Sequence, residues 1–165
     1  MLDGRVLMAD RDRDPAGRAR NARPRDGLGR PLPRGSAGGT ERVPDKLDMG
    51  VDDAVALAQH YLDDGRPFHA HEVLEALWKT QPGAERDLWQ GLAQIAVGST
   101  HALRGNAVGA TTLLRRGAGR VADYVGDTHG IDVDGVVRWA ESLASAPTTT
   151  FPNLRLSNAH ELRDL

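Results

Sequence analysis

Apolar residues recur along the middle of the chain at intervals of three and four, the spacing of one face of an α-helix. This pattern predicts five helices, over residues 51–64, 67–80, 84–104, 106–125 and 132–145. Residues suited to helix ends separate these segments, among them Gly65, Pro67, Gly105 and Asn106. The connections are short, so neighbouring helices should pack antiparallel. The sequence therefore predicts an all-α fold, a compact bundle or array of about five helices.

The third predicted helix is unusual because it carries no charged side chain between Leu88 and Leu103. A helix on the surface needs a polar face, so this one should be surrounded by other helices. Gly91 and Gly98 fall on one side of it, where the backbone of a neighbouring helix could approach closely. Its polar side chains form a single line along another side: Gln90, Gln94 and His101.

The two ends of the chain lack helical periodicity. Residues 9–45 are rich in Arg, Gly and Pro and cannot bury enough apolar surface to offset the entropy of ordering by themselves. We therefore divide the chain into an N-terminal arm (1–45), an all-helical domain (46–146) and a C-terminal tail (147–165). The arm should be extended or partly disordered, either docked on the domain or free. Met8 is an alternative start to Met1.

The tail should be extended up to Leu156, and one helical turn should follow at its end.

Composition narrows the class of protein further. The formal net charge is -2, and the chain has no cysteine, which excludes disulfides and thiolate chemistry. The arm holds ten Arg against seven acidic residues, but these acids dilute its charge and no aromatic residues interleave, so nucleic acid is not an expected partner. No apolar run reaches the length of a membrane span or a signal peptide, so we expect a cytoplasmic protein.

The second predicted helix places polar residues at the edge of its apolar face. His71 and Glu75 are one turn apart and next to Trp78, so they can contact each other and a common partner. Glu72 points more towards solvent, and His69 should face water on the far side. Trp78 is expected to anchor the core.

The turn between the second and third helices is short, so their polar residues should meet. The facing set would be His71, Glu75, Gln90, Gln94 and His101, with Glu72 and Trp78 behind it. Buried polar groups without partners cost roughly 1–3 kcal/mol each, so these should satisfy one another or a ligand. On that basis we expect His71→Ala and Glu75→Ala each to lose about 1–3 kcal/mol of stability.

Three interpretations of this set remain open. It could be a hydrogen-bond network that fixes the register of two helices. It could hold a small ligand or a divalent metal, with His71, Glu75 and His101 as metal ligands. It could support catalysis, with Glu75 or His71 as acid or base. The sequence "HEVLE" matches only the first half of the zinc-protease motif HExxH, and no Glu-x-x-His pair of a di-iron site is present.

The segments "FHAHEVLEALWK" and "LWQGLAQIAVGSTHALRGNAVGATTLLRRG" resemble the bacterial domain-of-unknown-function family numbered 309. The resemblance covers about residues 52–125. It rests on His71, Glu72, Glu75, Trp78, Gln90, Gly91, Gln94, His101, Gly105 and Asn106. It implies a small all-helical fold and an arm that docks on the domain. The activity of that family is not established, so the resemblance transfers positions without roles.

Taken together, the residues predict a binding or interaction protein whose polar set is largely structural. Its ligand would be a small anion or a protein partner, which the sequence does not name. The alternative is a metal-dependent hydrolase that uses His71, Glu75 and His101. The sequence leaves the oligomeric state open.

Overall fold

The computed structural model describes residues 23–40, 43–44 and 46–157. Five α-helices follow one another in this part of the chain, with a short 3-10 helix before the third. They are α1 (Val51–Asp63), α2 (Pro67–Thr80), η1 (Gly83–Glu85), α3 (Arg86–Leu103), α4 (Ala107–Asp123) and α5 (Val133–Ser145). The predicted all-α fold is confirmed, and the helix boundaries agree with the predicted ones within two residues. The helical turn predicted after Leu156 lies outside the described residues.

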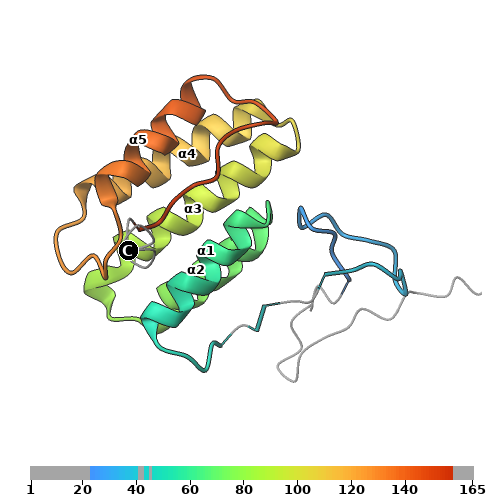
Figure 1. The fold of residues 1–165 in the computed structure, drawn as a ribbon, viewed down its shortest axis with the longest axis horizontal. Coiled ribbons are helices and arrows are strands. Elements are labelled where there is room, and N and C mark those ends of the chain that lie inside the picture. The colour runs from blue at the N-terminus through green and yellow to red at the C-terminus, as the bar shows by residue number, and fades with distance from the viewer. Residues whose placement is uncertain (1–22, 41–42, 45, 158–165) are drawn as a thin grey trace, which may run out of the picture.

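Each helix packs on the next one in sequence, so the domain is an array of antiparallel neighbours (Figure 1). Helix α3, which carries no Asp, Glu, Lys or Arg from Leu88 on, lies in the middle and packs against both α2 and α4. Its large apolar side chains are fully buried: Leu88, Trp89, Leu92 and Ile95. The expectation that other helices surround α3 is therefore confirmed, and α3 forms the centre of the core.

The residues at the helix ends take the roles that their chemistry suggests. Pro67 opens α2, where its missing N–H costs nothing. Gly105 follows α3 with φ +77°, a conformation that suits glycine. The Asn106 side chain caps α4 by accepting a hydrogen bond from the Gly109 amide at 3.0 Å. Asp132 caps α5 in the same way.

Helices α3 and α4 approach each other closely at glycines. A Cβ added to Gly91 would lie 3.0 Å from the Gly117 carbonyl oxygen, and one added to Gly98 would lie 2.7 Å from Leu114 Cγ. The predicted close approach at Gly91 and Gly98 is confirmed. Gly117 supplies the matching position on α4, so the two backbones meet with no side chain between them.

The segment after α5 crosses the array and returns to α1 (Figure 1). Both ends of the Gln59 side-chain amide, on α1, make hydrogen bonds to the backbone of this segment. Its Nε2 donates to the Leu154 carbonyl at 2.9 Å, and its Oε1 accepts from the Leu156 amide at 2.7 Å. Trp139 on α5 donates from Nε1 to the Pro152 carbonyl at 2.9 Å. Because Leu154 and Leu156 are buried, this segment closes the core on one side.

The described part of the arm lies at the end of the array where α1 passes into α2 (Figure 1). The Arg104 guanidinium donates from Nε to the Leu28 carbonyl at 3.1 Å. Gly29 packs on Phe68 so tightly that an added Cβ would overlap the Phe68 ring. Val43 is buried in the core. The arm therefore contacts α2, α3 and the core of the domain.

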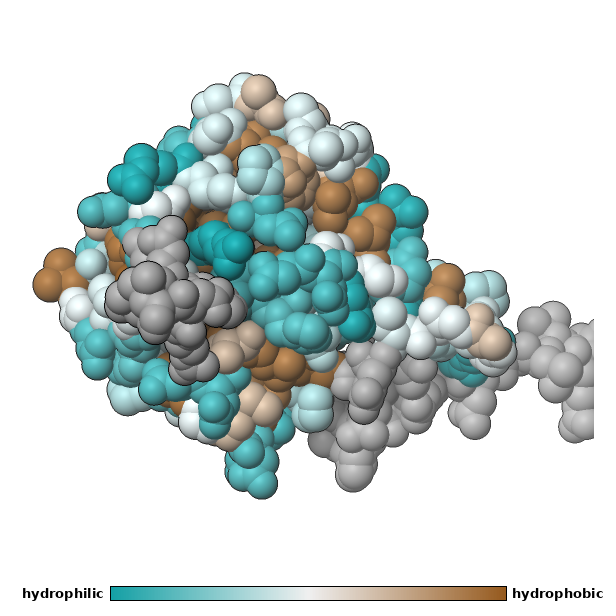
Figure 2. Space-filling view, in the orientation of Figure 1, coloured by the Kyte–Doolittle hydropathy of each residue, from teal (hydrophilic) through white to brown (hydrophobic). Residues whose placement is uncertain are grey.

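None of the helices in the described ranges is both long and apolar enough to cross a membrane. On the face shown in Figure 2, polar and apolar residues are interspersed, and no single apolar area dominates.

Candidate functional site

A pocket with a cavity volume of about 160 Å³ lies between α2, α3 and α4. We call it the polar pocket. Its lining residues are His71, Glu75, Trp78, Gln90, Ala93, Gln94, Val97 and Leu113. Four of the five residues predicted to face one another, His71, Glu75, Gln90 and Gln94, thus line one cavity. Trp78, predicted to stand behind them, forms part of the wall.

The helix faces explain why these side chains meet. On α2, Val73, Leu74 and Leu77 are buried, which leaves His71 and Glu75 at the margin of the apolar face. The short connection through η1 turns α3 antiparallel to α2, with its uncharged polar line towards that margin. Helix α4 adds Leu113 on a third side. The pocket therefore lies where α2, α3 and α4 meet beside the polar margin of α2.

A chain of charged contacts runs along α2 at the pocket. His71 Nε2 lies 3.3 Å from Glu75 Oε2, and Lys79 Nζ lies 2.9 Å from Glu75 Oε1. Burial lowers the pKa of His71, although the Glu75 carboxylate raises it in part. His71 is therefore neutral at pH 7, and Lys79 balances the charge of Glu75.

The protein leaves part of the pocket's hydrogen-bonding capacity unused. Among the residues that the structure describes, Gln94 Oε1 and His71 Nδ1 are buried without a hydrogen-bond partner. The Phe68 backbone favours protonated His71, but it makes no hydrogen bond of good geometry to Nδ1. A buried unpaired polar atom costs roughly 1–3 kcal/mol. The polar set is therefore not a network that closes on itself.

His101, the fifth predicted residue, does not line the polar pocket. It lies near the end of α3, where its Nδ1 accepts a hydrogen bond from Asn106 Nδ2 at 3.0 Å. Within the described ranges, no group of three or more His, Asp and Glu side chains could hold a metal ion. The metal set of His71, Glu75 and His101 expected from the sequence is therefore not assembled. Glu72 is half-buried on α2 and also lies outside the lining.

His69 is buried, contrary to the expectation that it faces water. Only 2% of its surface is exposed, because the arm covers it. Its Nε2 lies 2.8 Å from Thr40 Oγ1, and its ring packs against Tyr61 at 5.4 Å between centroids. Burial lowers the pKa of His69 to about 4; the Arg66 guanidinium adds to this effect and Asp26 opposes it. Helical periodicity on α2 alone could not reveal a covering segment that begins far upstream.

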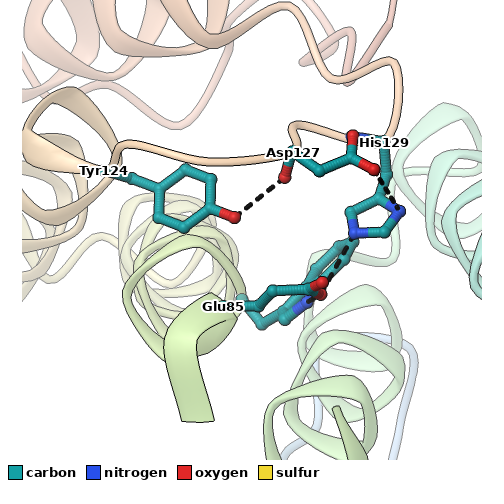
Figure 3. A network of polar contacts seen from close by, with 5 residues as sticks. Glu85, Tyr124, Asp127 and His129 are labelled. Carbon is teal, nitrogen blue, oxygen red and sulfur yellow. Dashed lines mark hydrogen bonds and ion pairs between the residues drawn. The ribbon is translucent and has the colours of Figure 1, made fainter. Parts of the chain in front are cut away.

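A second group of polar contacts joins the start of α3 to the loop between α4 and α5 (Figure 3). The Glu85 carboxylate accepts from Trp89 Nε1 at 2.9 Å and lies 3.1 Å from His129 Nε2. The Tyr124 hydroxyl donates to the Asp127 carbonyl at 2.9 Å. His129 lies in a turn, with φ +50°, and its side chain is only 19% exposed.

No pattern in the sequence indicates this group because its members come from two separate turns. Asp127 Oδ1 accepts from the His129 amide at 2.8 Å, which fixes the turn. One oxygen of the Glu85 carboxylate then contacts both the His129 imidazole and the Trp89 indole. These contacts attach the loop to the core, so we assign the group a structural role.

The contacts in the polar pocket predict how two substitutions change the free energy of unfolding. We expect His71→Ala to lower the free energy of unfolding by about 1–2 kcal/mol, since the ring packs 5.4 Å from Phe68. Glu75→Ala should lose less than about 1 kcal/mol because its side chain is 31% exposed and its contacts lie within one helix. The loss expected for Glu75→Ala is thus smaller than the roughly 1–3 kcal/mol expected from the sequence alone. Denaturant unfolding measures both, and losses above 2 kcal/mol in both variants would show a coupled buried network instead.

The fold and the pocket define the class: an all-helical domain of five helices with a polar pocket between the second, third and fourth. Residues 55–113 of the chain match the family described as Domain of unknown function (DUF309). The chain is similar to that family over this segment, which confirms the resemblance seen in the sequence. The matched residues include all those that line the polar pocket. Comparisons with curated proteins and with solved structures give no match.

Proposed function

We propose that this domain binds a small molecule in the polar pocket. The observation that carries the proposal is the unpaired side-chain oxygen of Gln94. This residue lines a cavity of about 160 Å³, yet one end of its amide is buried without a partner among the described residues. The two ends of a side-chain amide exchange places by a half-turn, so a ligand can select which one it meets. Most buried side-chain polar atoms in proteins have a hydrogen-bond partner, so an unpaired oxygen that also lines a cavity favours a binding role.

Binding is better supported than catalysis. A general base needs a reacting group within hydrogen-bond reach, and His71 Nε2 is directed to Glu75 at 3.3 Å. A hydrolase that uses a metal would need a third ligand near His71 and Glu75, and His101 pairs with Asn106 instead. As part of the proposal, we place this binding activity in the cytoplasm.

The experiment is a screen of small polar molecules by protein NMR, using the full chain labelled with ¹⁵N. We expect at least one compound to shift the side-chain amide signals of Gln90 and Gln94 in a saturable way. Signals of the Gln59 side chain, which contacts the C-terminal segment instead, serve as the internal control. A screen in which no compound moves the pocket signals would contradict the proposal.

Gln94→Leu separates the binding interpretation from the structural one. Leucine is similar in volume and removes the buried unpaired oxygen, so we expect the free energy of unfolding to stay constant or rise by about 1 kcal/mol. Compounds that raise the melting temperature of the native protein should lose this effect in the variant. Gln81→Leu, at the end of α2 outside the pocket, should leave the effect intact. A loss of 1–3 kcal/mol in Gln94→Leu would instead show that Gln94 belongs to a structural network.

A further inference from the structure

The volume of the polar pocket limits the size of its occupant. Its cavity of about 160 Å³ is close to the roughly 150 Å³ that holds one benzene-sized molecule. A disaccharide, a nucleotide or a cofactor with two ring systems would not enter completely. The buried part of the ligand is therefore about one six-membered ring with its substituents.

The charges around the pocket favour a neutral ligand. Glu75 is the only formally charged residue in the lining, and Lys79 contacts it at 2.9 Å. His71 is neutral at pH 7 because burial lowers its pKa. A bound anion would face the Glu75 carboxylate inside the pocket, whereas the nearby cations Lys79 and Arg25 lie outside the lining, and such a contact is costly in a desolvated site. The small anion considered from the sequence alone is thus disfavoured.

The polar side chains favour a ligand with both donors and acceptors. Gln90 and Gln94 lie on successive turns of α3, and both line the cavity. Each side-chain amide carries an N–H donor beside a C=O acceptor, the pairing with which glutamine reads the edge of a nucleobase. Glu75 can accept one more N–H. The indole of Trp78 in the wall supplies an apolar aromatic surface for a flat ring.

We propose that the ligand is a neutral planar heterocycle of one ring with adjacent N–H and C=O groups, the chemistry of a pyrimidine base. The proposal rests on the function proposed above and names its ligand class. The same ring could come from a free base, a nucleoside or a single-stranded nucleic acid. These sources share the edge that the glutamines would recognise, and they differ in what extends from the ring into solvent.

The test is an NMR titration of the full chain with uracil, uridine and a uridine hexanucleotide. We expect uracil to shift the side-chain amides of Gln90 and Gln94 with a Kd of roughly 1 mM, as suits a ligand of this size. 1,3-Dimethyluracil keeps the ring but has no N–H donor, so it should bind at least ten-fold more weakly. Benzoate, a flat anion of similar size, should not bind.

The three sources give distinguishable results, and each supports the proposal. Tightest binding of uracil would point to the free base. Equal or tighter binding of uridine would point to a nucleoside whose ribose lies outside the pocket. A further gain with the hexanucleotide would point to a single strand.

Two variants test the residues that carry the proposal. Gln90→Leu and Gln94→Leu should each weaken uracil binding at least ten-fold, because each removes one amide that pairs with the ring. Gln81→Leu should leave the affinity unchanged. Because two positions are changed separately, loss of folding in one variant leaves the other as a test. Unchanged affinity in a folded variant would overturn the proposal.

The remaining outcomes separate this proposal from the proposed function. If dimethyluracil or benzoate binds as well as uracil, the ligand class is wrong. The same conclusion follows if none of these compounds binds while others from the broader screen shift the pocket signals, and the pocket then remains a binding site. If no compound of any kind shifts these signals, both proposals fail.

Discussion

Gly117→Ala should lower the free energy of unfolding by about 2–3 kcal/mol and the melting temperature by roughly 10 °C. The added Cβ would lie 2.6 Å from the Gly91 carbonyl oxygen and 2.8 Å from Ile95 Cγ1. The first of these atoms belongs to the backbone of the central helix, so it cannot move aside by a change of rotamer. Helices α3 and α4 would have to separate along their shared face. Thermal and denaturant unfolding measure the effect.

Gly119→Ala, two residues further along α4, provides the matched control. Nothing lies within 4 Å of a Cβ at this exposed position. Alanine favours helix over glycine by about 1 kcal/mol, so this variant should be slightly more stable than the native protein. The same change in one helix should therefore have opposite signs at the two positions. Equal effects at Gly117 and Gly119 would contradict the close approach of α3 and α4.

Acidification should destabilise the domain through His69, by about 3 kcal/mol between pH 6.5 and pH 4. The pKa of this group falls from an ordinary value of 6.5 to about 4 in the folded protein. Between these values the unfolded chain binds a proton that the folded chain does not. The stabilisation is therefore complete above pH 6.5 and is lost as the pH falls towards 4. Denaturant unfolding across this range gives the slope.

The groups that face His69 show why protonation is unfavourable. The Arg66 guanidinium repels a second positive charge, and Asp26 in the arm opposes this effect. Nδ1 is buried without a hydrogen-bond partner in the described part of the chain, so a proton there would remain unpaired. Nε2 already contacts Thr40 Oγ1 at 2.8 Å. Protonation should therefore loosen the contact between the arm and α2.

His69→Gln isolates this contribution because the glutamine amide can still donate to Thr40 but does not titrate. The difference in stability between the native protein and this variant should depend on pH between 6.5 and 4. His60→Gln, which changes a histidine whose side chain is 66% exposed, is the control. Direct NMR titration should place His69 near pH 4. Titration of His69 at its ordinary pKa would show that the arm does not cover it in solution.

The sequence predicted the helices well because their signals are local. Each boundary depends on residues a few positions apart, such as the Asn106 side chain that caps α4. The absence of charge from Leu88 to Leu103 predicted the central place of α3, since a helix without a polar face must be covered on several sides. Gly91 and Gly98 predicted a close neighbour, but the partner glycine on α4 could not be chosen before the two helices were packed.

The polar pocket was predicted in part. His71 and Glu75 were expected to face Gln90 and Gln94 because a short turn joins the two helices, which restricts how they can pack. His101 was expected with them but lies seven residues beyond Gln94. Two turns of helix span about 10 Å, which carries it past His71 to the end of α3 and to Asn106. The predicted polar line of Gln90, Gln94 and His101 does run along the pocket side of α3. It extends beyond the pocket, however, so His101 lies outside.

The sequence by itself determined the five helices, their ends and the faces on which the polar residues of α2 and α3 lie. The tertiary structure decided which of those residues share a cavity and which segments cover the rest. His69 is buried by an arm that begins far upstream, and Gln59 pairs with a backbone segment more than ninety residues away. Periodicity describes one helix at a time, so contacts between distant segments emerge only when the whole chain is packed.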